Sequence, residues 1–242
     1  MAPRRFVPLV DLMAGRADDV SALIISRRVE VDGRVIDNPA ALVPEAAAVV
    51  IRPERVLQGT RKLRAVLGDA GVDPSGRACL DVGAAAGGFT SALLEAGARI
   101  VYALDAGYGQ LTGALRQDPR VVNLERTNLA ELDRSAVPEP VDLVTVDLSY
   151  LSLARALPQL APLALTPGAE LLALVKPTFE LHRSRLASGE DDVDQAGQRA
   201  AEAAVASGWI VVGVLPSPVP GRGGAREAFL HARWQPDGPS PS

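Results

Sequence analysis

The chain has 242 residues, of which 48% are hydrophobic and 22% charged, and its formal net charge is −4. These values are typical of a globular protein with one large or two modest domains. The acidic balance and the aromatic content of 4% disfavour a generic nucleic-acid-binding protein, which is usually basic. The single cysteine excludes a disulfide framework and a zinc cluster, so no metal is expected. Without a secretory signal or an apolar run of membrane length, we expect a cytoplasmic protein.

Residues 1–52 are predicted to form a small α+β module. Asp19 is placed to cap a helix, and Asp32-Gly33 lies between alternating apolar residues, which indicates a β-hairpin. Basic residues outnumber acidic ones over the first 64 positions. The expected elements are helices over residues 6–14 and 20–26, a hairpin over 27–35 and a strand over 48–52. Residues 53–59 are expected to be a linker.

Residues 60–234 are predicted to form a second, larger α/β domain, and the Pro- and Ser-rich residues 235–242 a disordered tail. Continuous apolar strands alternate with helices, which favours a mostly parallel sheet covered on both faces. The last two strands have no helix between them, so we expect a hairpin that adds an antiparallel strand at one edge. The predicted strands are 78–82, 99–104, 121–124, 143–146, 170–175, 210–215 and 228–232. The predicted helices are 60–70, 88–96, 110–116, 130–135, 151–163 and 194–207.

A glycine-rich turn follows the first of these strands. Such a turn lets the backbone approach a ligand, and the next helix directs free N–H groups toward it. Asp105 ends the second strand, where a doubly wound sheet binds a ribose hydroxyl. The dinucleotide fingerprint fails at Ala85, and no P-loop is present. Asp81, at the end of the first strand, would repel a pyrophosphate. The residues therefore favour S-adenosylmethionine, which is cationic and has no phosphate, as a ligand lying across the turn Gly83–Phe89. The alternative is a tight turn with no ligand.

Further polar residues end the later strands, where open α/β sheets bind their ligands. Asp147 closes the fourth strand, and Lys176 closes the fifth, directly before Pro177. Lys176 forms either a structural salt bridge with a neighbouring acid such as Asp147 or part of an acid–lysine pair at the reactive end of the cofactor. Glu227 precedes the last strand, and a hairpin can return it to the same edge.

Several stretches together resemble the TlyA-type (haemolysin A) ribosomal RNA ribose methyltransferases of the FtsJ-like class. The most specific are Gly-Tyr-Gly-Gln-Leu over residues 107–111 and Glu-Arg-Thr-Asn over 125–128. The resemblance covers nearly the whole chain, and the first sixty residues look like the alpha-L RNA-binding module of that family. It implies a Rossmann-like class I methyltransferase sheet of seven strands, the last antiparallel. It also implies S-adenosylmethionine as cofactor and RNA, in ribosomal RNA or ribosomal subunits, as partner.

The resemblance also implies the roles of individual residues. That class uses a Lys-Asp-Lys-Glu tetrad to methylate a ribose 2′-hydroxyl, and the matching positions are Lys62, Asp147, Lys176 and Glu227. Lys176 would either accept the hydroxyl proton or stay protonated and stabilise the developing alkoxide. The matching cofactor positions are Asp81, Gly83, Ala84, Gly87, Gly88, Phe89, Asp105, Asn128 and Asp147.

Departures from the family pattern gather in the segments expected to face RNA. Gln58-Gly59-Thr60-Arg61 stands before the first lysine, and Gly224-Ala225-Arg226 before the glutamate. Residues 182–192 also differ from the basic run usual there. These differences leave two alternatives: the same catalytic frame redirected to a small molecule, or a binding protein with a vestigial tetrad.

Overall fold

The computed structural model describes residues 5–52, 56–182 and 189–235. The described residues divide into two compact units, one of residues up to 56 together with 112–118, and one of 57–111 together with 119–235. The segment 112–118 holds the short helix α5 (Gly113–Gln117). Residues 53–55 of the expected linker and residues 236–242 of the expected tail lie outside the described ranges.

The first unit combines three short helices, one of them α5, with two small sheets. The hairpin prediction is confirmed, because Asp32 and Gly33 both have positive φ, at 47° and 81°, as a tight two-residue turn requires. Asp19 caps α2 by accepting a hydrogen bond of 2.8 Å from Ala22 N. Residues 6–8 were predicted helical and are instead strand β1, because they pair with β4. The elements are β1 (Phe6–Pro8), α1 (Leu9–Leu12), α2 (Val20–Ile25), β2 (Val29–Val31), β3 (Arg34–Ile36), β4 (Leu42–Pro44) and β5 (Val49–Ile51).

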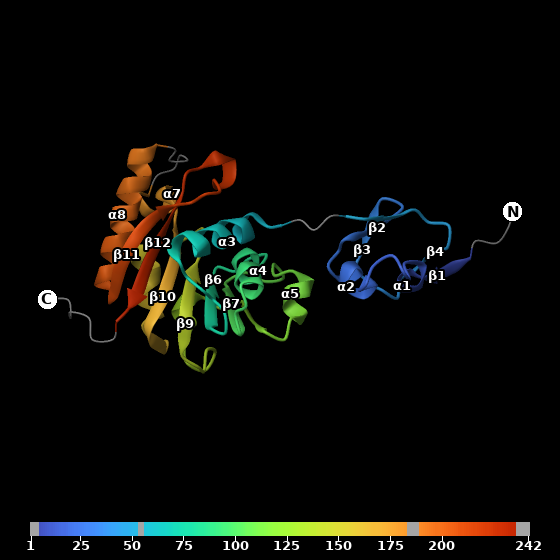
Figure 1. Ribbon diagram of the computed structural model, residues 1–242, viewed down its shortest axis with the longest axis horizontal. Coiled ribbons are helices and arrows are strands. Elements are labelled where there is room, and N and C mark those ends of the chain that lie inside the picture. Colours follow the sequence, from blue (N-terminus) through green and yellow to red (C-terminus); the bar gives the residue numbers. More distant parts are fainter. Residues whose placement is uncertain (1–4, 53–55, 183–188, 236–242) are drawn as a thin grey trace. The chain divides into compact units, whose positions relative to one another are not determined.

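The second unit is built on a seven-stranded sheet of order β11-β12-β10-β9-β6-β7-β8 (Figure 1). Its strands are β6 (Ala78–Val82), β7 (Ile100–Asp105), β8 (Val121–Glu125), β9 (Val141–Val146), β10 (Leu165–Val175), β11 (Trp209–Pro216) and β12 (Ala228–Trp234). β12 is antiparallel to both of its neighbours, so the prediction of an antiparallel last strand is confirmed. Its predicted place was wrong: β12 lies between β10 and β11, and β11 forms the edge.

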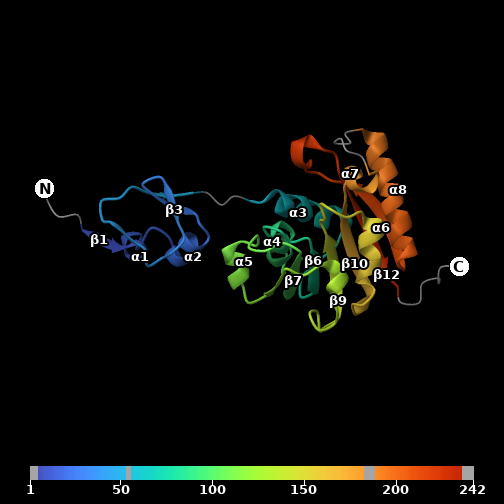
Figure 2. The same ribbon diagram turned by 180° about the vertical axis from the view of Figure 1, so that it is seen from behind.

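Helices cover both faces of the sheet, with α3 and α4 on one side and α6 and α8 on the other (Figures 1 and 2). The main core lies between the sheet and the elements α6, η2 and α8. These three elements contribute Leu153, Leu157 and Ala200 to the core. The helical elements are α3 (Gln58–Ala70), α4 (Gly88–Glu95), η1 (Leu129–Glu131), α6 (Leu153–Ala156), η2 (Leu157–Leu160), α7 (Pro177–Glu180), α8 (Glu190–Ala206) and η3 (Arg222–Gly224). No helix in the described ranges is long and apolar enough to cross a membrane.

Two predicted helices are shorter than expected for local reasons. The predicted helix 130–135 is reduced to the single 3₁₀ turn η1, because the Asp133 carboxylate accepts hydrogen bonds from Ser135 N and Ala136 N and so competes with helix formation. The predicted helix 151–163 breaks into α6 and η2 at Pro158, which lacks an N–H group. The parallel strands all run in one direction, so their carboxyl ends meet at one edge of the sheet.

Candidate active site

The glycine-rich turn after β6 has a backbone that few residues other than glycine adopt. Gly83, Ala85 and Gly87 have φ values of +89°, +46° and +92°. A Cβ atom on Gly83 would lie 2.4 Å from the carbonyl oxygen of Asp147, which itself follows β9. The Asp147 N–H donates a 2.8 Å hydrogen bond to Val82 O. Position 83 therefore needs glycine both for its φ and for the close approach of the two strand ends.

Asp81 is fully buried beneath this turn. Its two carboxylate oxygens accept hydrogen bonds from Thr90 Oγ1 at 2.6 Å and from Thr145 Oγ1 at 3.2 Å. Burial raises the pKa of Asp81 to about 7, against the lowering effect of the two threonine hydroxyls, and the negative charge of Asp147 adds to the rise. Asp81, one of the predicted cofactor residues, thus holds the first turn of α4 through its hydrogen bond with Thr90.

Asp105, at the end of β7, connects the glycine-rich turn to the next loop. Its carboxylate accepts hydrogen bonds from Ala85 N at 2.8 Å and from Gly107 N at 2.6 Å. A carboxylate offers about four lone-pair positions, so these two contacts leave acceptors for ribose hydroxyls. Ala84 is buried and donates to Leu104 O at 3.0 Å. Asn128 is exposed between β8 and η1.

Helix α3 packs closely against the start of α4. A Cβ atom on Gly88 would lie 2.9 Å from Gly59 Cα, and Thr60 Oγ1 donates a 2.9 Å hydrogen bond to Gly88 O. The Phe89 ring stacks on Phe229 of β12 with centroids 5.9 Å apart, and both rings are buried. Phe89 therefore serves to pack the turn against the end of the sheet, and the small residues let α3 approach.

Lys62, one turn into α3, forms a buried ion pair with Glu227. Lys62 Nζ donates to Glu227 Oε2, and each side chain is only 7% exposed. A buried pair of this kind is costly to break, because removing one partner leaves the other charge without compensation. Gly221 makes room for the carboxylate: a Cβ atom there would lie 2.3 Å from Glu227 Oε1. The loop before β12 is thus built around Glu227.

Lys176 and Asp147 form a second, partly buried pair. Lys176 Nζ lies 2.5 Å from Asp147 Oδ1 and donates hydrogen bonds to Leu148 O at 3.0 Å and to Ser149 Oγ at 2.8 Å. The contact with Asp147 has the distance of an ion pair without the geometry of a hydrogen bond. Asp147 Oδ1 is buried and accepts no hydrogen bond from any residue that the structure describes. Oδ1 is therefore enclosed by the protein and faces the ammonium group of Lys176.

Strand register places the two pairs at the same edge of the sheet. Val175 pairs with Ala228 across β10 and β12, so Lys176 and Glu227 stand at the next facing position. On the other side of β10, Ala173 pairs with Val146, the residue before Asp147. The structure therefore confirms that the glutamate returns to the edge that carries the lysine.

The sequence reasoning missed several supporting residues. Thr90 and Thr145 bind Asp81, and Ser149 binds Lys176, but single hydroxyl residues beside a strand end give no distinctive pattern. Glu125 ends β8, and the sequence placed it only within the Glu-Arg-Thr-Asn motif. It accepts hydrogen bonds from Gln110 N and Leu111 N, which lower its pKa to about 2 despite the opposing effect of desolvation. Within the described residues, no group of three or more His, Cys, Asp or Glu side chains could hold a metal ion.

Comparison with known families agrees with this geometry. The profile of the FtsJ-like methyltransferases matches residues 56–234. The chain belongs to the FtsJ-like methyltransferase family. It is 42% identical to the 16S/23S rRNA (cytidine-2′-O)-methyltransferase TlyA of Mycobacterium tuberculosis, over 93% of this chain and 87% of the relative. It is 30% identical to Hemolysin A of Brachyspira hyodysenteriae, over 86% and 90% of the two chains.

The solved structures bear out the fold of this FtsJ-like methyltransferase. A hemolysin-like protein of Streptococcus thermophilus superimposes with a TM-score of 0.71 at 27% identity, covering 98% of this chain and 91% of that one. The family resemblance and the α/β class drawn from the sequence motifs are therefore confirmed. The turn after β6 and the Asp105 carboxylate have a geometry that suits a ligand with hydroxyl groups and no phosphate.

Proposed function

We propose that this methyltransferase transfers a methyl group from S-adenosylmethionine to a ribose 2′-hydroxyl of ribosomal RNA. The Mycobacterium tuberculosis relative is named for this activity on 16S and 23S rRNA. The observation that carries the proposal is the arrangement of the four charged residues: segments far apart in the sequence meet as the pairs Lys62–Glu227 and Lys176–Asp147 at one edge of the sheet.

We assign the cofactor to the turn over Gly83–Phe89, with Asp105 on its ribose and Asp81 supporting the turn. When bound, S-adenosylmethionine supplies an electrophilic methyl group on a positively charged sulfur. The other predicted cofactor positions fall into two groups. In this assignment Ala84, Gly87 and Gly88 would contact the cofactor through their backbone, and Asn128 and Asp147 through their side chains.

A sugar hydroxyl is a weak nucleophile, so alignment supplies much of the rate. Lys176 donates two hydrogen bonds to protein groups and contacts Asp147 Oδ1, so its ammonium group is held at the edge of the sheet where we place the 2′-oxygen. There it stabilises negative charge as the oxygen–carbon bond forms and the carbon–sulfur bond breaks. The hydroxyl proton passes to the Asp147 carboxylate, whose side chain is 26% exposed, because the oxygen becomes strongly acidic once it is alkylated. Lys62 and Glu227 fix the opposite wall of the site.

We further propose that residues 1–52 bind RNA and that the catalytic domain runs to residue 234. This domain begins with α3 at Gln58, so the expected linker 53–59 and the expected domain start at 60 are corrected by two residues. The first unit contributes an arginine-rich surface, with Arg5, Arg27 and Arg34 exposed. Such residues bind phosphate groups and hold an RNA in register. The substrate is then ribosomal RNA, free or within ribosomal subunits, and we place the enzyme in the cytoplasm, where ribosomes operate.

Methyl transfer from radiolabelled S-adenosylmethionine tests the proposal. Ribosomes, isolated subunits, naked rRNA and a cell extract of metabolites are offered in parallel. We expect label in rRNA at a 2′-O position, and its loss in Lys176→Met, with binding of S-adenosylhomocysteine retained. Label in a metabolite and none in RNA would replace RNA by a small-molecule substrate. Full activity of Lys176→Met would remove the proposed role of that residue.

A further inference from the structure

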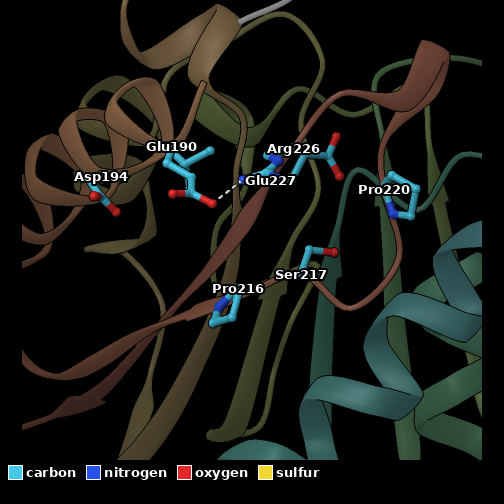
Figure 3. A pocket seen from close by; sticks show the side chains of 8 residues that line it. Glu190, Asp194, Pro216, Ser217, Pro220, Arg226 and Glu227 are labelled. Carbon is cyan, nitrogen blue, oxygen red and sulfur yellow. Dashed lines mark hydrogen bonds and ion pairs between the residues drawn. The ribbon is translucent and has the colours of Figure 1, made fainter. Parts of the chain in front are cut away.

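A cavity of about 340 Å³ lies against the candidate catalytic glutamate (Figure 3). Its walls come from the start of α8, the end of β11 and the loop before β12. Residues that line it include Val193, Asp194, Pro216, Pro220, Arg226 and Glu227. Its volume is at the lower end of the range of about 300–1,000 Å³ for small-molecule sites, so it suits one ring system.

The cavity and the candidate site share Glu227 as a wall. Arg226 and Glu227 point in opposite directions, as adjacent residues of an extended chain do (Figure 3). Arg226 reaches back to Glu190, with Nη1 2.6 Å from Oε1, while Glu227 pairs with Lys62. A group in the cavity therefore sits beside the position proposed for the reacting ribose.

The loop that forms one wall is held in place by its own hydrogen bonds. Ser217 N donates to Glu227 O at 2.9 Å, Ser217 Oγ donates to Val219 O at 2.8 Å, and Gly221 N donates to Ala225 O at 2.7 Å. Gln58 Nε2, at the start of α3, donates to Pro220 O. The cavity is thus formed before any ligand arrives, which reduces the entropy cost of binding.

The chemistry of the lining excludes a phosphate and fits a nucleobase. Val193, Pro216 and Pro220 offer apolar surfaces for a flat ring. Glu227 is compensated by Lys62 and Glu190 by Arg226, whereas Asp194 makes no ion pair or hydrogen bond with any residue in the described ranges. A free carboxylate repels phosphate and accepts hydrogen bonds from an exocyclic amino group, as protein acids do with cytosine N4.

We propose that this cavity holds the base of the nucleotide next to the methylated ribose, and that Asp194 selects a base with an exocyclic amino group. The inference rests on the proposed function and adds a specificity site to it. Bases of single-stranded RNA can be splayed out into such pockets. Uracil carries a carbonyl oxygen at the corresponding position, which would place an acceptor against the exposed carboxylate of Asp194 in place of a donor.

The first test fills the cavity. Val193→Phe places a ring in it, and Val205→Phe makes the same change on an exposed site of α8 away from it. With an RNA that the wild type methylates, we expect Val193→Phe to raise KM for RNA at least about tenfold. Affinity for S-adenosylmethionine and the melting temperature serve as folding controls and should match those of Val205→Phe. Equal KM values in the two variants overturn the inference.

The second test varies the base next to the target nucleotide. RNA fragments carry cytosine or uracil on the 5′ or the 3′ side of the target nucleotide. We expect the wild type and the control Asp191→Ala to prefer cytosine on one side by about tenfold to a hundredfold in kcat/KM, and Asp194→Ala to lose this preference. An unchanged preference in Asp194→Ala overturns the inference while leaving the proposed function intact. If the wild type methylates no RNA, both the proposed function and this inference are overturned.

Discussion

Replacing Asp81 by Asn should make the methyltransferase unit more stable at neutral pH. Asp81 is completely buried, and its neighbours are two threonine hydroxyls and the carboxylate of Asp147. No cation among the residues that the structure describes is paired to it. An amide fills the same space without a charge to desolvate. It accepts a hydrogen bond from Thr90 and presents its NH₂ group toward Thr145.

The size and sign of the effect follow from the pKa. The pKa of Asp81 rises from an ordinary 3.8 to about 7 in the folded state. At about 1.4 kcal/mol for each tenfold change, ionising the buried carboxyl costs on the order of 4 kcal/mol. Between these two values the folded chain binds more protons than the unfolded chain, so wild-type stability falls as pH rises, and the loss is complete above about pH 7.

Urea unfolding in half-unit steps from about pH 4.5 to about pH 8 measures this difference. Trp209 and Trp234 are the two tryptophans of the chain, and their rings pack 5.4 Å apart in the larger unit, so their emission reports on that unit. The advantage of Asp81→Asn over the wild type should grow with pH to a few kcal/mol and then level off.

Asp133→Asn is the matched control, because hydrogen bonds from Ser135 lower the pKa of Asp133. The Asp133 carboxylate stabilises the folded state at pH values above the pKa that it has in the unfolded chain, and this stabilisation is lost only as pH falls. The loss of unfolding free energy in Asp133→Asn should therefore stay nearly constant above about pH 5. A difference between Asp81→Asn and the wild type that does not change with pH would refute the reasoning about Asp81.

Three further substitutions test the contacts around the site. Gly83→Ala should destabilise the protein by roughly 2–5 kcal/mol and abolish cofactor binding, because a Cβ atom would meet Asp147 O at 2.4 Å at a positive φ; calorimetric titration with S-adenosylhomocysteine measures the loss, and normal binding would contradict the clash. Lys62→Met should cost about 3–5 kcal/mol in urea unfolding by leaving Glu227 unpaired, and a second change, Glu227→Gln, should restore most of it; no recovery would show that the pair is not coupled. Gly88→Ala should lower kcat by displacing α3, whose Gly59 Cα would lie 2.9 Å from the new Cβ, whereas Gly68→Ala, with no atom within 4 Å, should add up to about 1 kcal/mol of stability and keep kcat.

Physical reasoning from the sequence predicts the α/β fold and those site residues that end a strand. Apolar strands alternating with helices predict the parallel sheet, and the rule that ligands sit beyond strand ends singled out Asp105, Asp147 and Lys176. Lys62 is different: its partner Glu227 is 165 positions away, and no local spacing connects them. That assignment came from the family resemblance.

Errors arose where distant contacts override local patterns. Phe6–Pro8 has helical spacing of apolar residues, but pairing with Leu42–Pro44 makes it a strand. The position of β12 inside the sheet depends on its pairing with both β10 and β11, which a hairpin pattern does not reveal. Pro158 and Asp133, by contrast, were visible in the sequence and explain the shortened helices.

The ion pair between α3 and the loop before β12 has a consequence for biosynthesis. α3 is the first helix of the larger unit to leave the ribosome, and β12 is its last strand. Lys62 therefore gains its counter-charge only after the loop before β12 has been synthesised, and the ion pair that joins α3 to this loop forms late in the synthesis of the larger unit.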